Sequence, residues 1–353
     1  MMRHPAISAW QFFGLFAVSF VTVPLSLMPN GIFHTAKQDA WIGLLIGFSM
    51  SFLLLLGLFW LTLRQKVDKE PPARLSVIHR FFLAVHFLFL LVVTIVTVRN
   101  FIEVVHGYFL VETPMIVLSF ILLLTAGYAA WTGLSSIMRL GSLVFLFAAT
   151  IIMLMPLTVL EEVEIRQFMP ILAQPPLSIA YAAWQSFGMC SEYLFLFFFV
   201  PYIKFPTKRR IAVYVASMLM GFLLLLSMVI QIFFVFGPHL AGSLLIPAVE
   251  LVKYITLYEF WERVDVALVA VWTVMITIKT GALLWLCHKH LGVIFGLKDS
   301  KGLVVPLVLM MSPLSIMFSD NVSEFMFFYH HLYVYIVLIG AISYIGTGKA
   351  TLT

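Results

Sequence analysis

Charged residues are scarce in this sequence: Asp, Glu, Lys and Arg together make up 10% of its 353 residues. A typical soluble domain carries about 25%. Hydrophobic residues make up 62% of the chain, and no soluble fold of this size could cover so much apolar surface. The composition therefore excludes a cytosolic enzyme, a nucleic-acid-binding protein and a disordered chain.

Motifs for metal binding, redox chemistry and hydrolysis are also missing. The two cysteines, Cys190 and Cys287, lie far apart in or beside apolar runs, so no disulfide framework is expected. There is no HExxH, CxxC or Gly-x-Ser-x-Gly motif, and the histidines at 288–290 and 330–331 do not place two rings on one helix face. The Gly-Thr-Gly-Lys at 346–349 lacks the first glycine of a phosphate-binding loop. We predict no enzymatic activity, no metal and no cofactor.

Long apolar stretches are what the sequence does have. A helix that spans a bilayer needs about 20 mostly apolar residues. Ten such stretches occur, separated by short loops, at residues 7–29, 40–63, 81–105, 114–131, 140–160, 177–203, 211–237, 264–285, 303–319 and 327–346. The sequence therefore predicts an all-α polytopic membrane protein in which residues 1–353 form a single transmembrane domain.

Basic residues indicate how these spans are oriented. If the N-terminus is cytoplasmic, fifteen of the 21 Lys and Arg residues fall on the cytoplasmic side and five on the outer side. The acidic run at 161–164 is then outside, and the basic loops 64–80 and 204–210 are inside, where they can meet anionic lipid or a partner domain. This bias predicts a multi-pass protein of a bacterial membrane with both termini in the cytoplasm.

Ten spans divide into two sets of five, at about 7–160 and 177–346. Because five is odd, the second set enters the membrane with opposite polarity, as an inverted repeat of the LeuT type requires. Binding sites in such folds lie where the first helix of each half is interrupted. Here the first span holds Pro24 and Pro29, and the sixth holds the small residues Gly188, Cys190 and Ser191. We expect the first span to kink or unwind at its prolines.

Several short elements resemble one known family. They are Ile7-Ser8 with Gln11, Gln38-Asp39-Ala40-Trp41-Ile42, Thr113-Pro114 followed by Tyr128, Gly133 and Arg139, and Glu192 followed by Pro201 and a basic loop. This pattern resembles the GerAB-type B subunit of bacterial spore germinant receptors, in the amino acid–polyamine–organocation superfamily. The resemblance implies a LeuT-like fold, the spore inner membrane, and detection of a small germinant such as an amino acid. It also implies a complex with receptor A and C subunits.

The two helix interruptions supply the predicted ligand site. Its candidate residues are Thr22, Pro24, Ser26, Gly188, Ser191 and Glu192. Thr22 and Ser26 flank Pro24 at helical spacing, and could contact ligand or instead bond the carbonyls that the proline frees. The resembled family often has a small pair containing glycine before this proline. Phe20-Val21-Thr22-Val23 stands there instead, and its bulk is expected to narrow an amino-acid pocket.

Ionisable residues at membrane depth are costly and are functional candidates by default. Glu192 could hold a cationic group, a proton or a gating contact, or be a structural carboxylate. Lys279, in the eighth span, could occupy the place of a coupling cation, pair with Glu192, or snorkel to the interface. Arg99 and Glu103 share a helix face, either above the pocket or as an ion pair at a helix end.

Asp39, with Trp41 beside it, stands just before the second span. An aspartate in this position accepts hydrogen bonds from the free backbone N–H groups of the first helical turn, and tryptophan anchors at the membrane interface. We therefore expect Asp39 to cap the second span.

Three functions fit these observations. The first is a germinant receptor B subunit that senses a germinant and signals through its partners. The second is a transporter that moves an amino acid with a proton or another cation. The third is a non-binding scaffold subunit, an alternative that is compatible with the bulky residues before Pro24.

Overall fold

The computed structural model describes residues 7–64, 76–158, 169–202, 206–254, 264–297 and 299–347, and these ranges contain helices but no β-strand. The α-helices are α1 (Ala9–Ala36), α2 (Ala40–Arg64), α3 (Val77–Tyr108), α4 (Met115–Thr132), α5 (Leu134–Leu154), α6 (Pro176–Ser191), α7 (Thr207–Ser243), α8 (Pro247–Tyr254), α9 (Val264–Phe295), α10 (Val304–Met317), α11 (Val322–Phe327) and α12 (Tyr333–Thr347). Shorter 3₁₀ turns are η1 (Lys37–Asp39), η2 (Met155–Thr158), η5 (Glu192–Tyr202) and η6 (Lys301–Leu303), and η7 (Phe328–Leu332) is a π-helix.

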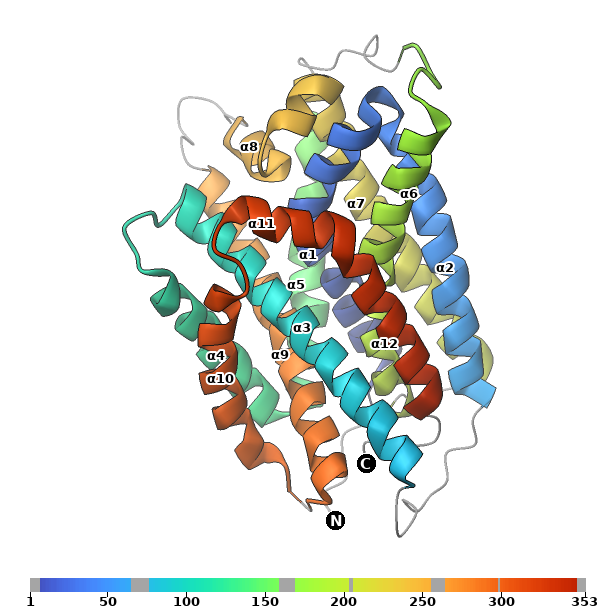
Figure 1. Ribbon diagram of the computed structural model, residues 1–353, viewed down its shortest axis with the longest axis vertical. Helices are drawn as coiled ribbons and strands as arrows, with labels where there is room; N and C mark the ends of the chain where they lie inside the picture. The colour runs from blue at the N-terminus through green and yellow to red at the C-terminus, as the bar shows by residue number, and fades with distance from the viewer. Residues whose placement is uncertain are drawn as a thin grey trace.

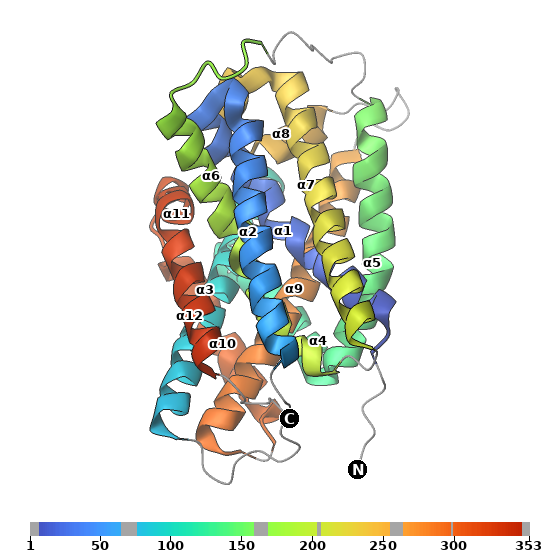
Figure 2. The ribbon, with the colours of Figure 1, turned by 90° about the vertical axis from the view of Figure 1, so that its right-hand side faces the viewer.

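Each of the ten predicted spans coincides with a helical segment of this structure. Seven stretches of the described chain are long and apolar enough to cross a membrane by themselves, and the first, Ala9–Leu63, contains both α1 and α2. Lys301–Met317, which includes α10, is apolar but shorter. The sixth span is divided between α6 and η5. Figures 1 and 2 show these helices side by side along the long axis of the molecule.

Several helices extend beyond the predicted ends, and two further details also differ from the prediction. The fifth helix begins at Leu134, directly after Gly133, whose φ of 102° suits glycine. Arg139 therefore lies within α5, with an exposed side chain. The predicted span, 140–160, had left it in the preceding loop. The short helix α8 was not predicted, although its buried Ala248, Val249, Leu251 and Val252 follow the helical i, i+3 spacing.

Helix contacts repeat between the two halves of the chain. α1 packs extensively on α7, and α2 on α6, which is the same contact if α1 corresponds to α6 and α2 to α7. By the same correspondence α3 packs on α12 as α9 packs on α5, and α4 packs on α9 as α10 packs on α3. Such paired contacts are what a five-plus-five inverted repeat produces.

Regular α-helical geometry is interrupted in two places in the second half of the chain. α6 changes into the 3₁₀ helix η5 at Glu192, and the π-helix η7 lies between α11 and α12. Figure 1 shows α11 and α12 meeting at an angle there. A long 3₁₀ segment within a helix and a π segment both commonly mark functional sites. The interruption predicted for the sixth span is therefore present.

Candidate ligand site and the buried charge network

Of the two outcomes expected at the prolines, a kink or unwinding, unwinding does not occur: α1 is helical from Ala9 to Ala36. Pro24 has no N–H, so the carbonyl of Phe20 loses its normal helical partner. The hydroxyl of Tyr193, from η5, donates a hydrogen bond of 2.9 Å to that carbonyl. A side chain from a neighbouring helix thus replaces the missing bond, which removes the main penalty for a proline inside the helix.

Two further side chains donate to carbonyls of the same helix. The indole N–H of Trp272, from α9, lies 2.9 Å from the carbonyl oxygen of Thr22. The Nε2 atom of His330, from η7, lies 3.0 Å from the carbonyl oxygen of Leu27. The proline-containing part of α1 is therefore connected to η5, α9 and η7 through its backbone.

The hydroxyls of Thr22 and Ser26 do not donate to the Phe20 carbonyl, which lacks its helical partner because of Pro24. Thr22 Oγ1 donates to the carbonyl of Ser19 at 2.9 Å, and Thr22 is fully buried. Ser26 Oγ lies 2.9 Å from the carbonyl oxygen of Val23 and 3.0 Å from Oδ1 of Asn100 on α3. The structure thus ties Ser26 to α3, whereas Thr22 bonds within α1.

Glu192 stands at the junction between α6 and η5 and has no exposed surface. One of its carboxylate oxygens pairs with the ammonium of Lys279 on α9, and the other accepts a hydrogen bond from the hydroxyl of Tyr333 at the start of α12. Lys279 is also fully buried, with its nitrogen 5.3 Å from the centre of the Tyr193 ring. Lys279 therefore does not snorkel, and the structure forms the pair that the sequence suggested.

These contacts form one connected network. Glu192 joins α6, α9 and α12, and its neighbour Tyr193 joins η5 to α1. The start of η5, α9 and the start of α12 thus meet at one carboxylate. The adjacent residue, Tyr193, links this carboxylate to the part of α1 that contains Pro24.

Gly188 and Ser191 have different surroundings. A Cβ atom on Gly188 would lie 2.7 Å from Cβ of Val334 and 2.9 Å from its Cα, so this glycine allows α6 to pack closely on α12. The hydroxyl of Ser191 is buried and has no hydrogen-bond partner within the described ranges. Of the two residues, only Ser191 offers a polar group to a ligand.

Arg99 and Glu103 form a buried ion pair on α3, with 2.6 Å between Nη2 and Oε1. Arg99 also donates to the carbonyl of Ile316, at 3.0 Å, in the last turn of α10. A cation at this place complements the unpaired carbonyls and the dipole of a helix C-terminus. This geometry indicates that the pair connects α3 to the end of α10.

Asp39 does not cap α2 as we had expected, because its carboxylate accepts hydrogen bonds from a different segment. Its two oxygens receive the backbone N–H groups of Leu172 and Gln174, each at 2.8 Å, and the residue is fully buried. The amide of Gln38 also contacts that of Gln174, at 3.4 Å. The Gln-Asp pair therefore holds the segment that leads into α6.

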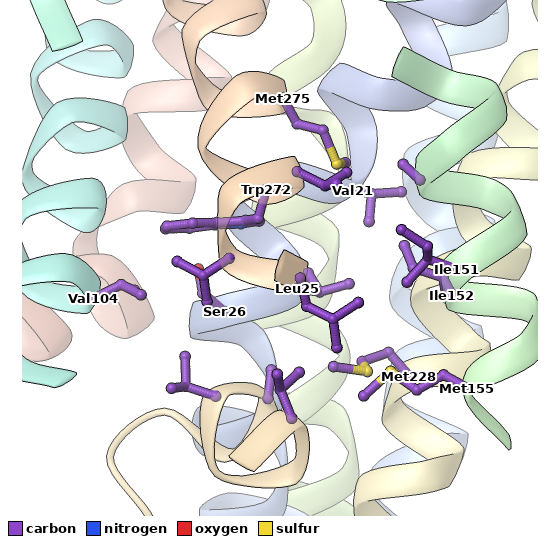
Figure 3. A pocket seen from close by; sticks show the side chains of 17 residues that line it. Val21, Leu25, Ser26, Val104, Ile151, Ile152, Met155, Met228, Trp272 and Met275 are labelled. Carbon is purple, nitrogen blue, oxygen red and sulfur yellow. The ribbon is translucent and has the colours of Figure 1, made fainter. Parts of the chain in front are cut away.

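A pocket lies between α1, α5, α8 and α9, with single residues contributed by α3 and α7. Figure 3 shows the side chains of Val21, Leu25 and Ser26 directed into it from α1, opposite Ile151 and Ile152 of α5. Seventeen residues of the described ranges line this space, and Ser26 is the only one of them that is not hydrophobic. The pocket adjoins the proline-containing part of α1, where the sequence placed the ligand site.

The predicted ligand residues are thus only partly brought together. Ser26 lines the pocket, whereas Thr22, Pro24, Gly188, Ser191 and Glu192 are not among its lining residues. The sequence did not point to four further residues. Trp272 lines the pocket, Asn100 bonds Ser26, and Tyr193 and Tyr333 belong to the buried network. Polar groups of Asn, Tyr and Trp within apolar spans were the available signal, because buried polar atoms need partners.

Metal binding finds no support in the described part of the chain, where no three His, Cys, Asp or Glu side chains lie close enough to hold an ion. Cys190 and Cys287 are both buried and free.

Together, the fold and the buried network define a multi-pass helical membrane protein with the inverted-repeat architecture of LeuT-type transporters. The chain belongs to the spore germination protein family, which it matches over residues 6–323. This is a family of permease-like membrane proteins and not an enzyme family. A curated relative, named "Putative spore germination protein YfkT", comes from Bacillus subtilis (strain 168). It is 26% identical over 309 residues, which cover 85% of this chain and 83% of that protein.

A solved structure confirms the fold. The substrate-bound, outward-open state of a Na⁺-coupled sialic acid symporter superposes with a TM-score of 0.59. The match covers 98% of this chain and 89% of the symporter at 10% sequence identity. At this identity the likeness concerns the arrangement of helices alone.

Proposed function

We propose that this chain is the B-type subunit of a germinant receptor in the spore inner membrane, and that it senses a small germinant. An amino acid is the germinant that the family resemblance implies. Partner subunits of the A and C type would carry the signal further. The observation that supports this proposal best is the pocket beside the proline-containing part of α1, in a chain of the spore germination family.

The contacts around the pocket suggest how binding would act. Trp272 lines the pocket and also donates to the Thr22 carbonyl of α1. A ligand that moves Trp272 would therefore change the position of α1, and with it the contact between Tyr193 and the Phe20 carbonyl. The effect would reach the Glu192–Lys279 pair, which connects α6 to α9.

Spores provide the direct test. Spores that lack the chain should lose their response to one or more germinants in a panel, and the wild-type gene should restore it. Ala148 of α5 lines the pocket, whereas its neighbour Ala149 does not. Ala148→Phe should fail to restore the response, and Ala149→Phe should restore it. Unchanged germination of the deleted strain on every germinant would refute the proposal.

Transport is the rival function. Uptake of a labelled amino acid into proteoliposomes by the purified chain, driven by a proton or sodium gradient, would favour a transporter. A scaffold role would be favoured if the deletion removes the response while Ala148→Phe, like the control Ala149→Phe, restores it fully. Co-purification with A- and C-type subunits from spore membranes tests the proposed partners separately.

A further inference from the structure

The lining of the pocket is unusual for a site that would hold a free amino acid. Among the lining residues that the structure describes there is no ionisable side chain, and Ser26 supplies the only hydroxyl. The one other polar group is the indole N–H of Trp272, which is already bonded to the Thr22 carbonyl. A ligand in this space therefore meets hydrocarbon on almost every side.

Two buried carboxylates in this part of the molecule are paired with other side chains. Val104 lines the pocket, but its neighbour Glu103 is paired with Arg99. The carboxylate of Glu192 is paired with Lys279 and bonded by Tyr333. Neither of these two pairs is free to neutralise an ammonium or carboxylate placed among the hydrophobic lining residues, and burying a charge without a partner is strongly unfavourable.

One uncharged polar contact is nevertheless available. Ser26 Oγ is bonded to Oδ1 of Asn100, whose Nδ2 atom is buried and has no partner within the described ranges. Because Ser26 already donates its proton to a protein acceptor, its oxygen can accept one hydrogen bond from a ligand hydroxyl. Three methionines, Met155, Met228 and Met275, complete much of the wall and can adapt to the shape of an alkyl group.

We propose that the pocket between α1, α5, α8 and α9 binds an uncharged, mainly hydrocarbon ligand with at most one hydrogen-bonding oxygen. This inference rests on the proposed sensing role for its biological meaning, and it replaces the amino acid implied by resemblance with an uncharged ligand. The ligand is either a free small molecule or the acyl chain of a lipid.

Two probes with the same alkyl group test the proposal. 3-Methylbutan-1-ol is uncharged, whereas L-leucine carries a similar branched chain together with two charges. Each is added to the purified full-length chain in nanodiscs, and the midpoint of thermal unfolding is followed as a function of concentration. Native mass spectrometry of the same sample measures retained lipid.

The alcohol should raise the midpoint of the wild type and of Ala149→Phe, and leucine should not. Ala148→Phe should weaken binding of the alcohol by at least about tenfold, because the ring fills the pocket. If Ala148→Phe does not accumulate, Val252→Phe on α8 closes the same pocket from another helix. A lipid that is retained by the wild type and by Ala149→Phe, but lost from Ala148→Phe and Val252→Phe, would identify the ligand as the acyl chain of a lipid.

Binding of leucine but not of the alcohol would overturn the inference. An equal response of the Ala148→Phe and Ala149→Phe proteins would also overturn it, as would the absence of any bound probe or lipid. These outcomes are independent of germination. If the probes behave as expected but deletion of the chain leaves germination unchanged, the pocket assignment stands and the proposed function fails.

Discussion

At the scale of single residues, Glu192 is the most consequential side chain, because it is fully buried and paired with Lys279. Glu192→Gln keeps the shape but leaves the ammonium of Lys279 without a counterion. We expect a loss of about 3–5 kcal/mol, because removing one partner of a buried pair leaves an uncompensated charge. Thermal unfolding in nanodiscs and protein abundance in membranes measure the loss.

The double variant separates structure from function. Glu192→Gln combined with Lys279→Met removes both charges and should recover most of the stability. Glu324→Gln, at an exposed position, serves as the control and should change stability by no more than about 0.5 kcal/mol. If Glu192→Gln is as stable as the control, the pair does not hold α6 to α9. A stable double variant without germinant response would assign the charges a role in signalling.

Asp39 permits a second test at this scale. Asp39→Asn replaces one of the two oxygens that accept the N–H groups of Leu172 and Gln174. We expect a loss of about 1 kcal/mol or more, because a partly buried backbone N–H then loses its acceptor. Asp299→Asn is the matched control, since Asp299 accepts the N–H of Lys301 at an exposed site. Equal unfolding midpoints for the two variants would contradict a clamping role for Asp39.

At the scale of elements, close packing of α6 on α12 depends on Gly188. Gly188→Ala would place a methyl group 2.7 Å from Cβ of Val334, with the Val334 backbone 2.9 Å away, so the helices must separate. We expect a loss of about 1–3 kcal/mol from overpacking. Gly57→Ala, in α2, meets no atom within 4 Å and should instead gain about 0.5–1 kcal/mol. The thermal unfolding midpoints of the two variants test this prediction. A higher midpoint in both variants would show that α6 and α12 have room for a methyl group at Gly188.

At the scale of the whole molecule, the distribution of basic residues makes a prediction about topology. Ser76, at the start of α3, and Glu112, beyond its end, are both exposed and lie at opposite ends of one span. In intact cells, Glu112→Cys should react with a membrane-impermeant thiol reagent, and Ser76→Cys should react only after permeabilisation. Cys190 and Cys287 are buried and give little background. The opposite labelling pattern would reverse the orientation of the whole chain.

Much of the architecture was accessible from the sequence. Apolar length alone located the spans, because a bilayer requires about 20 such residues per helix. The odd number of spans in each half indicated the inverted repeat. The candidate site was less accessible: the spacing of Thr22, Pro24 and Ser26 pointed to one helix, but only Ser26 reaches the pocket. Which side of α1 faces a cavity depends on its neighbours and not on its own pattern.

The sequence by itself thus determined the membrane class, the number of spans and the presence of costly charges at Glu192 and Lys279, since each follows from local hydropathy. Only the tertiary structure decided that α1 stays helical through Pro24, because the replacement donor, Tyr193, lies more than 160 residues away. It also decided that Asp39 holds the segment before α6. Contacts of this kind form between segments that are distant in the chain, and no local pattern in either segment encodes the partner.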